Sequence, residues 1–191
     1  MISNVRVFRM YDDVVLPEYA STHAACFDIR AYIKVEDRQN PIVIKAGETK
    51  LIPTGLKMAL PVDWELQIRP RSGMSLKTKI RIANSPGTCD SDYRGEIGVI
   101  VDNLNPDMDP IYKMMSDLVP LANLDSAVSY LTSYSQKEYS KKTDIMINHG
   151  DRICQGIFSV VHRPSAIIPV ADWDDNETVR GAGGFGSTGV K

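Results

Sequence analysis

The last stretch of the chain combines residue types that bind phosphate. Residues 180–189 contain five glycines together with Arg180, Phe185, Ser187 and Thr188. Glycines let backbone N–H groups approach an anion, hydroxyls add donors, and an arginine fork matches two phosphate oxygens. A Walker loop would need a following helix, and only two residues follow Gly189. We therefore expect residues 176–191 to form a flexible C-terminal lid over a site built elsewhere, the alternative being a simple glycine-rich terminus.

Two aspartates, a glutamate and an aromatic ring stand together in residues 90–96, Asp-Ser-Asp-Tyr-Arg-Gly-Glu. A carboxylate on a turn beside a rigid strand can take a proton from an attacking water, which is general-base hydrolysis. Asp and Gly clusters of this kind are also ordinary turns. The cluster alone leaves both interpretations open.

Three further segments carry polar side chains at turns or between apolar neighbours. Residues 70–75 hold an arginine and two serines, residues 150–155 lead from Gly-Asp-Arg to Gln155, and Asp28 stands between Phe27 and Ile29. Serine and glycine in turns are mostly structural. A carboxylate among apolar residues has to be paired or hydrogen-bonded, so Asp28 alone indicates only a satisfied acid.

Length and charge exclude several classes of function. The chain has 191 residues, which fits one domain, and a formal net charge of -2, which argues against direct binding to nucleic acid or acidic membranes. Its three cysteines have no metal-ligand spacing, and reduced thiols favour a cytoplasmic protein. We expect a soluble protein with no membrane span.

Short β-branched segments separated by Pro and Gly recur along most of the chain. They predict strands near residues 5–10, 42–44, 51–52, 56–60, 65–68, 80–83, 97–101, 153–161 and 167–170. This spacing is typical of an all-β sandwich or barrel. Residues 106–142 differ, because Leu124, Val128 and Leu131 fall at helical spacing behind Asn123 or Asp125. We predict a helical insertion there.

Five segments, taken in order, resemble the motifs of the trimeric dUTP pyrophosphatase (dUTPase) family. They are Ala25–Ile29, Pro70–Gly73, Gly87–Glu96, Gly150–Gln155 and Arg180–Gly189. The resemblance covers nearly everything outside residues 106–142. It implies a single domain over residues 1–191 with a jelly-roll-like β fold, and hydrolysis of dUTP to dUMP and pyrophosphate.

The same resemblance implies a role for each matching residue. Asp90 would deprotonate the water that attacks the α-phosphorus, and Tyr93 would pack under the deoxyribose and exclude UTP. The uracil edge would be read by Asn84, Gly87, Thr88 and Cys89. The α- and β-phosphates would be bound by Ser72 and Gln155, with Gly73 beside them and Arg71 supporting subunit contacts or phosphate charge. The γ-phosphate and the base would be held by Arg180, Phe185, Gly186, Ser187 and Thr188.

The family also implies partners. Mg²⁺ would bridge the substrate phosphates, with no direct protein ligand and with Asp28 reaching it through water. The chain would form a homotrimer with shared active sites, in the cytoplasm or, for a phage-encoded protein, in the host cytoplasm. Some phage dUTPases use an insertion in this interval for regulatory contacts, so residues 106–142 are a possible surface for a protein partner.

Some residues depart from the family pattern. Cys26 stands where glycine is usual, Cys89 replaces a branched aliphatic residue beside Asp90, and Pro86 stiffens the turn before Gly87. None of these changes removes a reacting group. Two alternatives stay open: a dCTP deaminase, which needs a glutamate base and lacks the complete fifth motif, and a nucleotide sensor whose insertion binds a regulator.

Overall fold

The computed structural model describes residues 4–106 and 143–170. The chain divides into two units, Met1–Val161 and His162–Lys191, and the fold below is that of the first unit. In the second unit, the described residues 162–170 contain no helix or strand. The strand predicted at residues 167–170 is therefore wrong, since Pro169 interrupts the apolar run and has no N–H to donate to a neighbouring strand.

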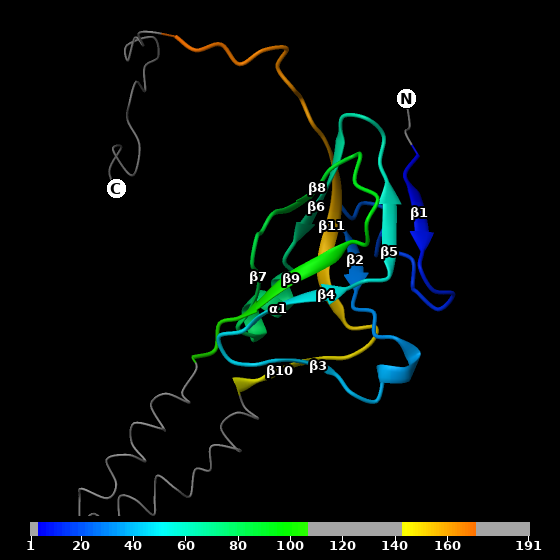
Figure 1. The fold of residues 1–191 in the computed structure, drawn as a ribbon, viewed down its shortest axis with the longest axis vertical. Helices are drawn as coiled ribbons and strands as arrows, with labels where there is room; N and C mark the ends of the chain where they lie inside the picture. The colour runs from blue at the N-terminus through cyan, green and yellow to red at the C-terminus, as the bar shows by residue number, and fades with distance from the viewer. Residues whose placement is uncertain (1–3, 107–142, 171–191) are drawn as a thin grey trace, which may run out of the picture. The chain divides into compact units, whose positions relative to one another are not determined.

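The first unit is built almost entirely of short strands (Figure 1). Besides one 3-10 turn at Val35–Asp37, its described helix is α1, Ser72–Lys77. The strands are β1 Arg6–Arg9, β2 Phe27–Arg30, β3 Ile42–Ile44, β4 Thr49–Pro53, β5 Leu56–Ala59, β6 Trp64–Arg69, β7 Ile80–Ile82, β8 Gly87–Cys89, β9 Gly98–Asn103, β10 Ile145–Ile147 and β11 Arg152–Val160.

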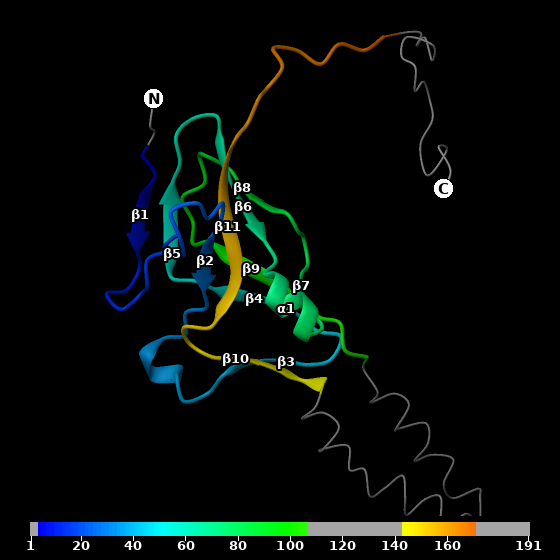
Figure 2. The same cartoon turned by 180° about the vertical axis from the view of Figure 1, so that it is seen from behind.

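Two antiparallel sheets make the main layers. One has the strand order β2-β11-β6-β8, and the other has the order β4-β9-β7. Strands β4 and β9 lie in front of β11 and β6 in Figure 1 and behind them in Figure 2, so the sheets face each other as in a sandwich. The pairs β1-β5 and β10-β3 complete the unit.

The core fills the space between these layers. Strand β9 alternates strictly, with Val99, Val101 and Asn103 buried and the residues between them half-buried. Strands β2 and β5 alternate in the same way, which is the period expected of strands with one face on a core. The largest fully buried apolar side chains are Ile29, Ile44, Ile52, Leu56, Leu66, Ile153, Val99 and Val101.

The all-β architecture is confirmed, and the structure adds elements that the sequence interpretation missed. Strands β2, β8 and β10 and helix α1 were not predicted as such, since each spans only three to six residues. The sequence predicts a turn at residues 70–75, whereas the structure has the first four residues of α1 at 72–75. Residues 107–142, which make up nearly all of the predicted helical insertion, lie outside the described residues.

Gly156 occupies a point in the central sheet where no side chain fits. It lies in β11 opposite Phe27 of β2 and Ile68 of β6. A Cβ built there would overlap the Phe27 ring, with Cζ only 2.6 Å away, and would lie 3.1 Å from Leu66 Cδ1. The Phe27 ring therefore packs directly against the backbone of Gly156.

Gly156→Ala should lower the free energy of unfolding by about 1–3 kcal/mol, because Phe27 must leave its packed position. Gly73→Ala is the matched control, since a Cβ at Gly73 meets nothing within 4 Å. Urea unfolding of the two variants at equal protein concentration measures the difference. An equal loss in both would contradict the packing argument.

Candidate functional site

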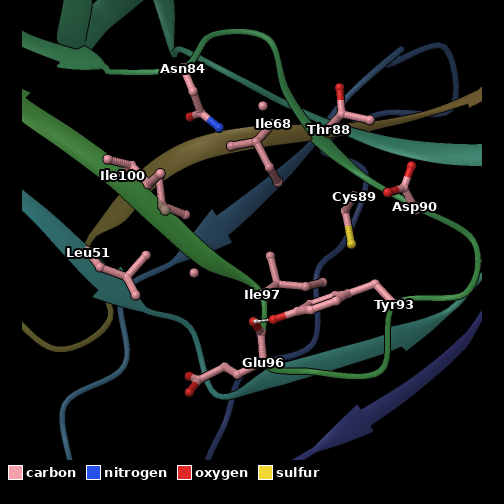
Figure 3. A pocket seen from close by; sticks show the side chains of 13 residues that line it. Leu51, Ile68, Asn84, Thr88, Cys89, Asp90, Tyr93, Glu96, Ile97 and Ile100 are labelled. Atoms are coloured by element: carbon pink, nitrogen blue, oxygen red, sulfur yellow. Dashed lines mark hydrogen bonds between the residues drawn. The ribbon is translucent and has the colours of Figure 1, made fainter.

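A pocket of about 270 Å³ opens between the edge strand β8 and the facing strand β9 (Figure 3). Strand β8 and the turns on either side of it supply the polar side chains, while β9 and β4 supply an apolar wall. The lining residues are Leu51, Ile68, Asn84, Gly87, Thr88, Cys89, Asp90, Tyr93, Glu96, Ile97, Gly98, Val99 and Ile100. A flat, partly apolar ring with polar edges suits such a lining.

The floor of the pocket depends on close backbone approach at Gly87. This residue is buried and pairs with Ile68 of β6. A Cβ at Gly87 would lie 3.1 Å from Asn84 Nδ2 and 3.4 Å from Ile68 Cβ. The absence of a side chain therefore lets the Asn84 amide lie against the strand, where it can donate to and accept from a ligand edge.

The turn after β8 holds Asp90 and Tyr93 next to each other. The Tyr93 N–H donates to the Asp90 carbonyl at 3.2 Å, and the Tyr93 hydroxyl donates to the Glu96 carbonyl at 3.0 Å. The Tyr93 ring lies over Gly95, where a Cβ would overlap the hydroxyl and lie 2.9 Å from Cε2. The exposed Asp90 carboxylate thus projects from a turn that backbone contacts hold in place.

Cys89 brings a thiol into the wall of the same pocket. Its side chain is partly buried and lines the pocket. Burial, and to a smaller extent the charge of Asp90, raise the pKa of the Cys89 thiol, since both disfavour the thiolate. Cys154 is fully buried in β11, and burial raises its pKa to about 12. Both thiols are therefore protonated near neutral pH.

A second polar cluster lies on the opposite edge of the same sheet, around Asp28 of β2. Arg71 Nε donates to Asp28 Oδ1 at 3.0 Å, Arg152 Nη1 donates to Oδ2 at 3.2 Å, and Gln155 Nε2 contacts Oδ1 at 3.4 Å. Arg71 also donates to the Arg152 carbonyl at 3.0 Å. The carboxylate thus gathers two guanidinium groups and an amide into one cationic cluster, where phosphate oxygens could bind.

The structure brings the predicted site residues together in two groups. Asn84, Gly87, Thr88, Cys89, Asp90 and Tyr93 share the pocket, whereas Arg71, Ser72, Gly73 and Gln155 do not line it. Strand β8 and strand β2 are separated by β6 and β11, which corresponds to three strand spacings, or about 14 Å. The predicted residues Arg180, Phe185, Gly186, Ser187 and Thr188 lie outside the described residues.

Some site residues were missed by sequence reasoning. Arg152 completes the Asp28 cluster, and Glu96 and Leu51 line the pocket. Arg152 and Glu96 lie within segments that resemble the family motifs. Their charge, close to predicted site residues, could have indicated that they contribute to the site. Leu51 belongs to β4, and the sequence contains no signal that β4 would face β8.

Comparison with known proteins gives a family for this arrangement of strands and polar clusters. A family model described as dUTPase matches residues 12–110. The chain is also 41% identical over 179 residues to the deoxyuridine 5'-triphosphate nucleotidohydrolase of Rickettsia bellii, covering 92% of this chain and 87% of that protein. This chain belongs to the dUTPase family. The Caulobacter vibrioides nucleotidohydrolase is 36% identical over 178 residues, covering 93% of this chain and 88% of that protein.

Solved dUTPase structures share the fold. A mutant of the Staphylococcus bacteriophage 80alpha dUTPase, solved with dUpNHpp, matches with a TM-score of 0.71 at 20% identity, over 98% of this chain and 99% of that chain. A mutant dUTPase from phage phi11 of S. aureus matches with a TM-score of 0.64 at 17% identity, over 90% of this chain and 99% of that chain. The β architecture expected of a dUTPase is therefore present in this chain.

Metal binding by dUTPases bears on the chemistry of the donor groups here. The phi11 structure is described as revealing the coordination of a structural Mg(II) ion. Among residues 4–106 and 143–170, no three His, Cys, Asp or Glu side chains gather into a metal site. No helix in these same residues is long and apolar enough to cross a membrane.

Asp90→Asn should lower the apparent pKa for alkylation of Cys89, because the substitution removes a negative charge that disfavours the thiolate. Alkylation should then begin at lower pH in the variant than in the wild type. Iodoacetamide labelling between about pH 7 and 10, a range that brackets an ordinary thiol, with peptide mass spectrometry, measures each thiol separately. Cys154 serves as the internal control and should stay unlabelled in the folded protein. An unchanged Cys89 profile would show that Asp90 does not act on the thiol.

Proposed function

We propose that this chain hydrolyses dUTP to dUMP and pyrophosphate by attack of water at the α-phosphorus. The observation that carries the proposal is the pocket in which Asn84, Asp90 and Tyr93 converge from β8 and its flanking turns. Sequence identity of 36–43% to nucleotidohydrolases of nearly equal length supports the same activity. The reaction limits uracil incorporation into DNA and supplies dUMP for thymidylate synthesis.

Asp90 is the proposed general base. Its carboxylate is exposed at the rim of the pocket and is held by the turn that the Tyr93 N–H closes. A carboxylate in this place can orient one water and accept its proton as the water oxygen attacks phosphorus. Most of the rate of phosphoryl transfer comes from positioning and charge neutralisation, so a base on a fixed turn is well suited to the task.

The pocket supplies the proposed selection of base and sugar. Asn84 and the strand Gly87, Thr88, Cys89 would bind the polar edge of uracil. As the family resemblance implies, this site would leave too little space for the methyl group of thymine. The Tyr93 ring, over Gly95, would pack against the deoxyribose and leave no space for a 2′-hydroxyl. The apolar side chains of β9 would cover the flat face of the base.

The phosphate groups would be bound by the cationic cluster of a neighbouring subunit. Arg71, Ser72, Gly73 and Gln155 do not line the pocket of their own chain, and the Asp28 carboxylate that Arg71 and Gln155 contact lies on β2, about three strand spacings from β8. One chain therefore does not bring these four residues into its own base pocket. A homotrimer with active sites shared between subunits would do so, with Arg180, Phe185, Gly186, Ser187 and Thr188 of the lid closing over the γ-phosphate and uracil.

Mg²⁺ would be bound mainly through the substrate phosphates. Asp28 Oδ1 accepts from two side chains and Oδ2 from one, and a carboxylate has about four acceptor positions. One position on Oδ2 is thus available for a metal-bound water, as the family resemblance implies. When bound, the ion would neutralise phosphate charge and orient the triphosphate.

Two further predictions rest on the sequence alone. One is a protein partner at residues 106–142. The other is a cytoplasmic location, or the host cytoplasm for a phage-encoded protein. Asn103 and Asn105, next to this segment, donate from their side-chain amides to the Thr143 carbonyl at 2.8 Å. These bonds join the two ends of the segment to each other.

With Mg²⁺ present, the protein should release pyrophosphate from dUTP and far less from dTTP, UTP or dCTP. Asp90→Asn should lower kcat for dUTP by at least about 100-fold, the usual contribution of a general base, while the dissociation constant for a non-hydrolysable dUTP analogue stays within about threefold. Pyrophosphate assay and calorimetry measure the two. Equal hydrolysis of all four nucleotides, or ammonia release from dCTP, would overturn the proposed function.

Deletion of residues 180–191 should abolish most dUTP turnover and leave the oligomer intact, because the lid groups act only on bound nucleotide. Steady-state kinetics and light scattering measure the two properties. Arg180→Lys keeps the charge but loses the planar fork, so it should show a smaller loss of turnover. Unchanged turnover after the deletion would refute the lid.

A further inference from the structure

Glu96 contributes to the pocket wall, yet its carboxylate is engaged elsewhere. In Figure 3 the carboxylate points away from the Tyr93 ring. Its Oε1 accepts hydrogen bonds from two successive backbone amides, Thr54 N–H at 3.1 Å and Gly55 N–H at 2.7 Å. A carboxylate that accepts two N–H donors forms a strong, charge-assisted contact. Glu96 therefore ties the segment after β8 to the turn between β4 and β5.

The main chain of the same residue holds Tyr93. The Tyr93 hydroxyl donates to the Glu96 carbonyl at 3.0 Å, which keeps the ring folded back over Gly95. The Tyr93 residue is 45% exposed, so core packing does not fix the position of its ring. Its orientation depends on where the Glu96 backbone lies.

The turn that receives the carboxylate is a rigid support. Thr54 is 2% exposed, and its hydroxyl donates to the Ile97 carbonyl at 2.6 Å. Gly55 has a φ of +70°, and a Cβ there would lie 2.5 Å from Val14 Cγ2. The Gly55 carbonyl in turn accepts from Met10 N–H at 2.8 Å. The Thr54–Gly55 turn is thus held by contacts other than those with Glu96. It would therefore keep its position if Glu96 moved.

We propose that Glu96 is a positioning residue for substrate discrimination: by binding the Thr54–Gly55 turn, it fixes the Tyr93 ring and thereby the rejection of a 2′-hydroxyl. The inference rests on the proposed function, because it assigns a cause to the sugar selectivity of that same site. It assigns Glu96 no part in the chemical step.

Glu96→Ala should raise KM for dUTP about tenfold and leave kcat within about threefold, because binding of the sugar is loosened while Asp90 is retained. The ratio of kcat/KM for UTP to that for dUTP should rise about tenfold. This is the size expected for loss of hydrogen bonds to a charged group. Steady-state kinetics with both nucleotides measures the split, and the ratio does not depend on the fraction of active protein.

Glu96→Gln is the conservative variant. Both amides donate to the single oxygen Oε1, and a glutamine carbonyl can accept the same two bonds. The UTP to dUTP ratio should return to within about threefold of the wild type. A ratio in Glu96→Gln as high as in Glu96→Ala would overturn the inference.

Glu48→Ala is the matched control. Glu48 also caps a turn through its carboxylate, accepting from Lys45 N–H at 2.8 Å, but it does not line the pocket. It should leave the UTP to dUTP ratio unchanged. A merely structural role for Glu96 would lower thermal stability in both variants and change the ratio in neither, and that result would also overturn the inference.

A double-mutant cycle tests the coupling to Tyr93. Tyr93→Phe removes the hydroxyl that contacts Glu96, so its effect on the ratio and that of Glu96→Ala should not multiply. A fully multiplicative double mutant would contradict the proposed link.

Amide hydrogen exchange tests the inference without measuring activity. The Thr54 and Gly55 amides should exchange faster in Glu96→Ala and not in Glu48→Ala. If the wild type fails to hydrolyse dUTP, the proposed function is wrong. Unchanged exchange of the Thr54 and Gly55 amides in Glu96→Ala would separately refute the role of Glu96 in holding this turn.

Discussion

The pairing of β11 with both β2 and β6 is the constraint on which the rest of the structure depends. Gln155 lies opposite Asp28 on one side and Arg69 on the other. The next residue, Gly156, leaves bare backbone under the Phe27 ring. Because the register of one strand determines the face of every side chain on it, this pairing places the Asp28 cluster at one edge of the sheet and, through β6, the Gly87 strand at the other.

Polar groups in this chain are positioned mainly by other polar groups rather than by packing. Asp28 gathers Arg71 and Arg152, and Glu96 holds the turn at Thr54 and Gly55. Each carboxylate accepts at least two donors, which offsets the cost of its partial burial. Asn103, buried at the end of β9, uses its amide in the same way, donating to the Ile44 and Thr143 carbonyls. Side chains held by such contacts keep the site geometry before any ligand arrives.

The separation of the pocket from the cationic cluster explains why a small β sandwich of this kind would act as an oligomer. A sheet of four strands spaces its two edges by about 14 Å; the base pocket lies at β8, and the Asp28 carboxylate that Arg71 and Arg152 contact lies on β2, the other edge. In the proposed homotrimer, each chain would contribute part of one site at one edge and part of another site at the other. Association would place unlike halves together without any change in the fold of the subunit.

The sequence by itself determined the all-β class, most strand positions and the family, because period-two alternation and the five motifs are local patterns of residue type. It also identified Asn84, Asp90 and Tyr93, which are close together in the chain and flank the same edge strand of the sheet. Only the tertiary structure decided that Leu51 of β4 faces this strand, that Glu96 turns its carboxylate to the Thr54–Gly55 turn, and that Arg71 and Gln155 contact Asp28 and do not line the pocket. These facts depend on strand order and on packing between sheets, which arise from contacts between residues distant in the chain.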